Sequence, residues 1–246
     1  MNKYAFALIT TLLSPLQVMA SPADYVHTPN VEYGEKEIDF KVGAAKQDNQ
    51  PNATASSIGL GFGATEYWFT EIYLERERED NAGVTLAEWE NKFQLTETGK
   101  YPVDLGFVVE VEAPLSNKHN PYELTMGPLF QTEFGKLQLN SNILFSRKLG
   151  PKDNDETTYN TQIGYQWQAK YRWLRAFEFG AQGFGEMGKW NSWDKSDLQN
   201  HRMGPAVFGK LDVGPKQAIK YNAAVLFGVS DAAPDHTFRM QVEYEF

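Results

Sequence analysis

The chain ends with the stretch HTFRMQVEYEF, residues 236–246, in which polar and apolar residues alternate from Thr237 onward. The apolar or aromatic positions are Phe238, Met240, Val242, Tyr244 and Phe246. The polar positions between them are Thr237, Arg239, Gln241, Glu243 and Glu245. Successive side chains of a β-strand point to opposite faces of its sheet. The stretch therefore predicts an amphipathic strand with one apolar and one polar face.

The same alternation recurs along the chain, for example over 104–112, 159–172 and 220–229, and helical spacing is not sustained anywhere. We count about twelve such segments, with 10–14 possible, and we expect all of them to be strands. The predicted spans are 34–45, 55–64, 67–78, 84–96, 101–112, 122–134, 136–148, 157–170, 174–187, 201–212, 217–229 and 236–246.

The connections between these segments fall into two classes. Long polar stretches occupy 46–52, 116–120, 151–155 and 190–197, whereas short turns occupy 64–66, 98–100, 134–136 and 213–216. The connection at 79–83 fits the long class least well. Longer loops on one rim and short turns on the other are typical of outer-membrane barrels, and closure removes free sheet edges. We predict an all-β fold, a closed antiparallel transmembrane β-barrel with short periplasmic turns and longer extracellular loops.

A soluble sandwich or lipocalin-like barrel is the alternative. The inward faces of a small soluble barrel should be mostly apolar, but one face of these segments is rich in Glu, Gln, Asn and Lys.

The N-terminus has the features of a secretory signal peptide. Lys3 precedes a mostly apolar run over 4–13, and Val18-Met19-Ala20 offers a small-residue cleavage point. A transmembrane anchor is the alternative, but the run is shorter than the ~20 residues that a spanning helix needs. We expect cleavage after Ala20, a periplasmic lead segment over 21–33 and a barrel over 34–246.

Composition narrows the possible partners and the means of stabilisation. The formal net charge is −9, which excludes nucleic acid as a partner because phosphate binding needs a basic face. There is no cysteine, so disulfides do not stabilise this exported chain. Mean hydropathy is −0.50 although aromatic residues make up 14%. This combination is expected for strands that present apolar residues to lipid and polar residues to a wet lumen.

Charged residues on the polar faces are candidates for lining that lumen. If Trp68, Ile72, Leu74, Trp89, Phe93 and Leu95 face lipid, the carboxylates between them face inward. Charged rings in a pore select ions or orient a polar solute, although they can also simply brace a narrow lumen. The candidate lumen residues are Glu71, Glu75, Glu88, Glu90, Lys92, Glu110, Glu112, Lys220, Arg239 and Glu243. We expect an acidic wall and a partly basic wall, to which Lys170 and Arg172 also belong.

No catalytic motif is present, and we expect no cofactor and no metal site. The four histidines, His27, His119, His201 and His236, do not pair at metal-ligand spacing. A loop metal site that combines them with Asp153, Asp155 or Asp235 remains open. We interpret the glycine-rich run 59–63 as a bent membrane strand. Aromatic residues are expected to form interfacial girdles rather than a ligand clamp: Tyr67, Tyr101, Trp167, Tyr171, Trp173, Trp190 and Trp193.

Two resemblances extend this prediction. The last strand resembles the C-terminal signal that the barrel-assembly machinery of Gram-negative bacteria recognises, with Met240, Val242, Tyr244 and Phe246 at the matching positions. The stretches IGLGFGATE (58–66) and EWENKFQL (88–95), with the last strand, resemble the outer-membrane proteins of the meta-pathway phenol-degradation family. That resemblance implies an exported barrel for hydrophobic or aromatic solutes. The acidic face departs from a lumen suited only to such apolar cargo.

Three functions follow as hypotheses. The first is a porin-like outer-membrane channel that passes small solutes down a gradient, with lumen charges setting its selectivity. The second is a plugged structural or binding barrel without transport. The third is an outer-membrane lipid-modifying enzyme, for which a Ser–His pair at the lipid face would be required. In all three cases the expected partners are outer-membrane lipid and, during biogenesis, the assembly machinery.

Overall fold

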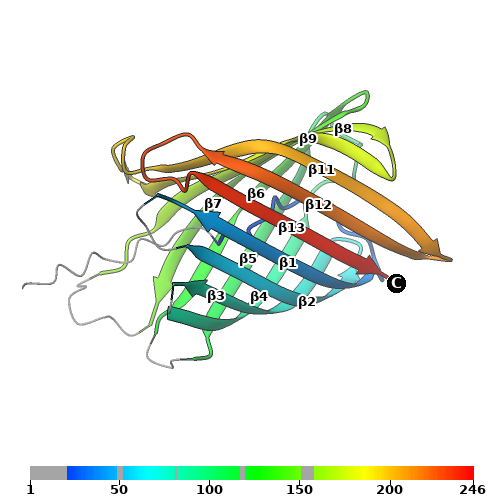
Figure 1. Cartoon of the computed structure of the whole chain (residues 1–246). Coiled ribbons are helices and arrows are strands. Elements are labelled where there is room, and N and C mark those ends of the chain that lie inside the picture. The colour runs from blue at the N-terminus through cyan, green and yellow to red at the C-terminus, as the bar shows by residue number, and fades with distance from the viewer. Residues whose placement is uncertain (1–20, 49–51, 81, 117–119, 151–157) are drawn as a thin grey trace, which may run out of the picture.

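The computed structural model describes residues 21–48, 52–80, 82–116, 120–150 and 158–246. Twelve long strands and one two-residue strand make up its regular structure (Figure 1). They are β1 (Lys36–Lys46), β2 (Ala53–Thr65), β3 (Trp68–Glu79), β4 (Ala82–Gln94), β5 (Asp104–Pro114), β6 (Tyr122–Phe134), β7 (Leu137–Leu149), β8 (Gln162–Leu174), β9 (Phe177–Lys189), β10 (Ser192–Trp193), β11 (Asn200–Gly214), β12 (Gln217–Gly228) and β13 (His236–Glu245). No helix in the described ranges is long and apolar enough to cross a membrane.

The twelve long strands form a closed antiparallel barrel. Each pairs with its neighbours in chain order, except that β9 pairs with β11 across the short β10 excursion. The first and last strands complete the ring, with Glu37 opposite Glu245 and Lys46 opposite His236. Every long strand therefore has two partners, and within the described residues no long strand is left with an open edge. The predicted fold class is confirmed.

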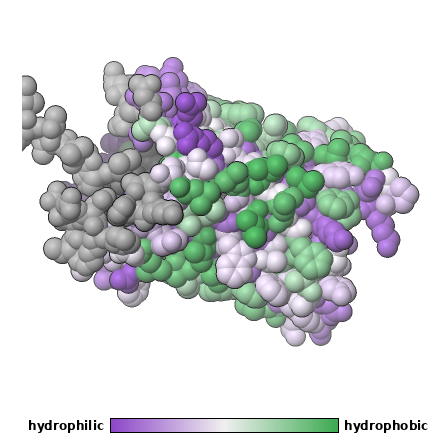
Figure 2. Space-filling view, turned by 90° about the horizontal axis from the view of Figure 1, so that it is seen from below, coloured by the Kyte–Doolittle hydropathy of each residue, from purple (hydrophilic) through white to green (hydrophobic). Residues whose placement is uncertain are grey.

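The two faces of the wall differ as the alternation predicts. On β3, Ile72 and Leu74 are 63% and 51% exposed, whereas Glu71, Tyr73 and Glu75 between them are buried. Figure 2 shows hydrophobic side chains across the middle of the visible outer face, with hydrophilic ones gathered mainly toward the ends. The apolar residues are thus on the side that lipid would cover, and the polar ones point into the barrel.

The connections differ from the prediction at two places. The link between β3 and β4 is short, because β3 ends at Glu79 and β4 begins at Ala82, whereas the link between β4 and β5 spans 95–103. In that longer link Lys100 N donates to the Glu97 carbonyl at 3.1 Å. Pro102 lacks an N–H group for the ladder, and β5 begins only at Asp104, later than predicted. β8 is also shifted, to 162–174 instead of 157–170. Parts of the predicted long loops, 49–51, 117–119 and 151–155, lie outside the described residues, as does the expected signal peptide.

The segment before β1 lies inside the barrel in the structure, although the sequence leads us to expect residues 21–33 as a periplasmic lead. Ser21 Oγ donates to Glu75 at 3.0 Å, near the long-loop end of the lumen. Val31 N donates to Gln94 at 2.7 Å, near the short-turn end. Residues 21–35, here named the lumen segment, therefore run along the interior toward the start of β1.

Inward glycines make room for this segment. A Cβ atom on Gly63 of β2 would lie 2.0 Å from the carbonyl oxygen of Glu32. On Gly106 of β5 it would lie 2.8 Å from the Cα atom of Pro29. At both positions only a residue without a side chain lets the two backbones approach this closely.

Candidate functional site in the barrel lumen

Two cross-strand rows of glutamates line one side of the lumen. In the first row Glu71 of β3 lies opposite Glu90 of β4, which lies opposite Glu110 of β5. Like charges at directly opposite positions destabilise a sheet unless something offsets them.

The second row runs one step closer to the long loops. It places Glu88 of β4 opposite Glu112 of β5, and Glu112 opposite Glu123 of β6. Lys148 of β7 lies opposite Glu123, so the row ends beside a cation. Three adjacent strands thus carry a line of carboxylates across the wall.

Two cavities occupy the lumen, on either side of residues 25–28. The cavity toward the long loops has a volume of ≈ 460 Å³ and is bordered by Glu88, Glu112 and Glu123. The cavity toward the short turns has a volume of ≈ 700 Å³ and is bordered by Glu71, Lys92, Lys170, Arg172, Lys220 and Glu243. Tyr25 borders both cavities. The lumen segment therefore narrows the passage between a mostly acidic chamber and a chamber of mixed charge.

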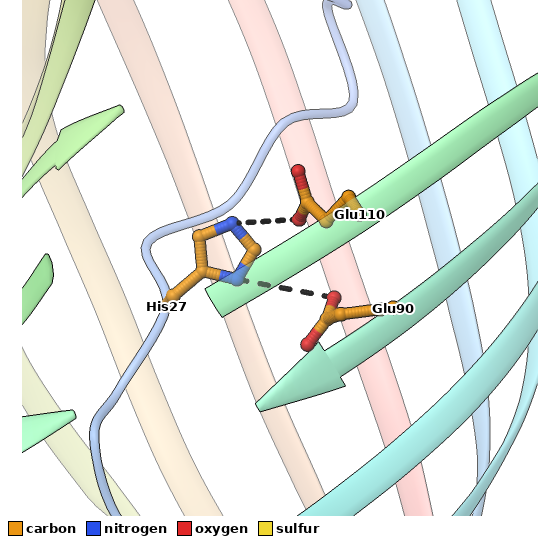
Figure 3. Close-up of side chains that lie close together, drawn as sticks. All are labelled: His27, Glu90 and Glu110. Atoms are coloured by element: carbon orange, nitrogen blue, oxygen red, sulfur yellow. Dashed lines mark ion pairs between the residues drawn. The ribbon is translucent and has the colours of Figure 1, made fainter. Parts of the chain in front are cut away.

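His27 is the centre of the segment's contacts with the acidic wall. Its Nε2 atom lies 3.1 Å from Glu110 Oε1 and its Nδ1 atom 3.9 Å from Glu90 Oε2. Figure 3 shows the ring between the two carboxylates, which come from neighbouring strands. The Tyr25 hydroxyl donates to the same Glu90 oxygen, and the Tyr25 ring is 4.6 Å from the His27 ring.

The backbone of His27 is anchored on the opposite wall. Asn142 Nδ2 of β7 donates to its carbonyl at 3.0 Å, and its own N–H donates to Gln166 Oε1 of β8 at 3.3 Å. Burial lowers the pKa of His27, but the Glu110 carboxylate, and after it Glu90, outweigh this effect and raise the pKa above its ordinary value. The first row of glutamates is therefore partly compensated by a cation from the lumen segment.

Lys41 of β1 supplies a second cation to the acidic wall. Its Nζ atom lies 3.7 Å from the centre of the Tyr25 ring, 3.5 Å from that of Tyr73 and 3.8 Å from Asp39 Oδ2. A lysine between two aromatic faces gains cation–π attraction. This contact also connects the lumen segment to β1 and β3.

Neutral amides form the wall opposite the glutamates. Gln138 and Asn140 of β7 both donate to Gln131 of β6, at 3.0 and 2.9 Å. Gln182 of β9 donates to Gln168 of β8 at 2.7 Å. These buried amides partner one another, and Arg172 and Arg239 donate to Gln138 and Gln182.

The third wall, β11–β13, carries four inward basic residues, Arg202, Lys210, Lys220 and Arg239. Arg239 is buried and donates to Gln182. Lys220 is within ion-pair distance of Glu35, Glu243 and Glu245, at 3.2 Å and 3.5 Å for the first two. The pKa of Glu35 rises to about 7, mainly because of burial, with its contact to Glu245 adding to the rise and Lys220 opposing it.

The structure directs all of the sequence-predicted lumen residues inward. Glu75, Glu88, Glu110 and Glu112 border the first cavity, and Glu71, Glu90, Lys92, Lys220 and Glu243 border the second. Arg239 alone of the predicted set is packed between neighbours rather than beside a cavity. The predicted assembly residues Met240 and Phe246 are exposed on the outer face of the last strand, and the Tyr244 and Phe246 rings stack 5.6 Å apart.

His201 and His236 lie apart from this site. The Nδ1 atom of His201 shares a hydrogen bond with the Tyr165 hydroxyl at 2.9 Å. The His236 ring packs edge-on against Phe227. These contacts are not the Ser–His pair that a lipid-modifying enzyme would need. His119, Asp153 and Asp155 lie outside the described residues.

Tyr25 and His27 are the site residues that the sequence-based reasoning missed. The lumen segment has no alternation, so nothing in it indicates contact with the barrel. One signal was present in the strands, because Gly43, Gly59, Gly61 and Gly63 all fall on inward faces of β1 and β2. A run of inward glycines leaves space that another part of the chain must fill.

Comparisons with known proteins identify the class of fold. No family model matches the sequence, and no curated protein is similar to it. Among solved structures, the NanC porin has a TM-score of 0.55 at 10% identity over 85% of this chain and 98% of the porin. The COG4313 outer membrane channel from Pseudomonas putida F1 has a TM-score of 0.56 at 14% identity over 92% and 99%. The translocator domain of autotransporter NalP from Neisseria meningitidis has 0.51 at 11% over 87% and 89%. The chain therefore has the fold of outer-membrane β-barrels.

Proposed function

We propose that this protein is an outer-membrane channel that passes small polar solutes, with a preference for cations, down their gradient. The second glutamate row carries the proposal. Glu88, Glu112 and Glu123 stand side by side at the border of the long-loop cavity, where a solute entering from outside would meet them. Rings and rows of carboxylates favour cations in a pore.

The electrostatic repulsion within this row supports a role for it in function. Like charges directly opposite one another destabilise a sheet, and the amide wall on the other side of the lumen shows that neutral side chains fit the same barrel. A line of three carboxylates therefore has a use that three glutamines would not serve. Mixed charges in the second cavity would then orient the solute on its way out.

The resemblance to the meta-pathway phenol-degradation family would imply hydrophobic or aromatic cargo instead. We favour polar cargo because charged or amide groups border both cavities. The similarity to NanC and to the COG4313 channel supports a channel and an outer-membrane location, and it indicates no particular solute.

Ion selectivity in a planar bilayer tests the proposal. The refolded mature chain would be compared with Glu88→Gln/Glu112→Gln/Glu123→Gln under a salt gradient. We expect a steady conductance in both and a clear loss of cation preference in the triple variant. As a matched control, Glu97→Gln removes a carboxylate in the exposed connection 95–103 and should leave selectivity unchanged.

A plugged structural or binding barrel is the second candidate, and the lumen segment favours it. Residues 25–28 lie between the two cavities and are held from both walls. Absence of conductance from a folded, inserted protein would contradict the channel and support this candidate. A variant without residues 21–33 that conducts would then show that the segment closes the pore.

A further inference from the structure

We propose that His27, Glu90 and Glu110 form a binding site for a divalent transition-metal ion of the zinc class. One ligand atom from each of the three residues lies within 4.8 Å of those of the other two. The proposal concerns metal binding alone and does not depend on transport through the barrel.

The three side chains converge from independent elements. His27 comes from the lumen segment, Glu90 from β4 and Glu110 from β5, and the two glutamates are cross-strand neighbours in register. Figure 3 shows the imidazole pointing between the two carboxylates. The register of two adjacent strands therefore fixes the spacing of the two carboxylates.

An unpartnered nitrogen gives the second, independent observation. His27 is only 4% exposed, and its Nδ1 atom has no hydrogen-bond partner among the described residues. A buried polar atom without a partner is costly and calls for an explanation. This nitrogen lies 3.9 Å from Glu90 Oε2, beyond hydrogen-bond distance but short enough for one ion, about 2.0 Å from each ligand atom, to bind both.

The donor set indicates the class of ion. One imidazole nitrogen with two carboxylate oxygens suits zinc and its first-row neighbours, whereas calcium and magnesium prefer oxygen ligands alone. Three protein ligands leave a fourth position for water, and the long-loop cavity, bordered by both His27 and Glu110, is a route by which an ion could enter.

The surrounding charges also favour a cation. Glu71 lies opposite Glu90 and has a buried oxygen without a hydrogen-bond partner. Glu88 precedes Glu90 by two residues on the same strand, so both side chains point inward. Lys41 and Lys92 are the lysines that act on Glu90. Lys41 is engaged by Asp39 and by the two tyrosine rings. The Tyr25 hydroxyl, which donates to Glu90, would orient that carboxylate as hydrogen bonds to metal ligands commonly do.

Zinc binding to the refolded full mature chain, without an affinity tag, tests the site. Equilibrium dialysis at pH 7.5 should show one zinc ion per chain in the wild type. His27→Gln and Glu110→Gln should each weaken zinc binding at least ~10-fold. Even mutation of residues that only hydrogen-bond to metal ligands lowers metal affinity by about 10–100-fold. Glu97→Gln is the control, because it removes a carboxylate in the exposed connection 95–103 that borders neither lumen cavity, and it should bind as the wild type does.

X-ray absorption of the zinc-loaded wild type covers the case in which a variant does not fold. We expect a first shell with one imidazole and otherwise oxygen ligands. No saturable zinc binding by the folded wild type would overturn the proposal, and so would binding by folded His27→Gln equal to that of Glu97→Gln. A first shell with two or more imidazoles would do so as well.

Discussion

Gly43 of β1 lies against the backbone of Pro22, and a Cβ atom on this glycine would be 2.1 Å from the Pro22 carbonyl oxygen. The contact joins the barrel wall to the beginning of the lumen segment. The wall residue at this position is a glycine, and its missing side chain leaves the space through which Pro22 and Ala23 pass.

Substitution of Gly43 by valine should displace the segment. The added side chain cannot share space with a backbone oxygen, and overpacking of this kind costs about 1–3 kcal/mol. We expect faster protease cleavage within residues 21–35 and a larger bilayer conductance than in the wild type. Ala44→Val adds similar bulk on the exposed outer face of the same strand and should change neither quantity. Unchanged cleavage and conductance in Gly43→Val would show that the segment does not restrict the lumen.

Replacement of Lys41 by methionine should destabilise the protein. The change leaves Asp39 buried without its cation and removes the cation between the Tyr25 and Tyr73 rings. Loss of one partner of a buried ion pair costs ~3–5 kcal/mol, and hydrogen bonds to Asp39 from Tyr73 and Gln241 should keep the loss at the low end.

The measurement for Lys41→Met is the urea midpoint in lipid vesicles. Lys46→Met removes a lysine at the exposed end of the same strand and should leave the midpoint nearly unchanged. Equal midpoints for the two variants would contradict a buried, stabilising Lys41.

A charge placed on the outer face at mid-depth should also be costly. Leu74 lies near the middle of β3 and is 51% exposed. Leu74→Lys should lower the free energy of unfolding in vesicles by ~2–4 kcal/mol, whereas a lysine near an interface costs ~0–1 kcal/mol. Tyr67→Lys, in the short turn before β3, provides the interfacial comparison. Equal costs at the two depths would argue against lipid contact at Leu74.

Glu35 should make stability depend on pH at the short-turn rim. Its pKa is raised from 4.5 to about 7, first by burial, so the folded state holds a proton that the unfolded state releases. The contribution of Glu35 to stability is then fully present below pH 4.5 and is lost as pH rises toward 7. Lys220, Glu37, Glu243 and Glu245 act on the same site, and the neutral variant Glu35→Gln separates the effect of Glu35 from theirs.

Urea midpoints of the wild type and of Glu35→Gln, measured from pH 4.5 to 8, check this. The wild type should lose stability relative to the variant between about pH 4.5 and 7 and stay parallel to it above. If the wild type instead gained stability relative to Glu35→Gln as the pH rises, the ionised carboxylate would be the stabilised form.

The terminal aromatic residue should matter for assembly. Phe246 N donates to the Lys36 carbonyl at 2.9 Å, and its ring stacks on Tyr244. We expect Phe246→Ala to slow insertion by the barrel-assembly machinery in reconstituted vesicles, while unassisted refolding in detergent remains near the wild-type rate. Phe238→Ala, at the other end of the same outer face, is the control. Equal slowing by both variants would attribute the effect to lost apolar surface rather than to a terminal signal.

The sequence alone determined the barrel and the direction of its side chains. Alternation is a local property, because adjacent side chains of a strand point to opposite faces whatever the strand pairs with. Glu71, Ile72 and Tyr73 could therefore be assigned to their faces from three consecutive letters. Alternation alone did not locate the strand ends. The alternating pattern begins at 157 although β8 starts at Gln162, and β5 starts only after Pro102, which cannot donate a ladder hydrogen bond.

Only the tertiary structure decided what fills the lumen. Which glutamates become neighbours depends on register, so the line from Glu88 through Glu112 to Glu123 could not be read from strands taken one at a time. The path of residues 21–35 depends on contacts between positions more than a hundred residues apart, such as His27 with Asn142. A segment without periodicity is placed by the shape and charge of the cavity that receives it, and that cavity exists only once the barrel has closed.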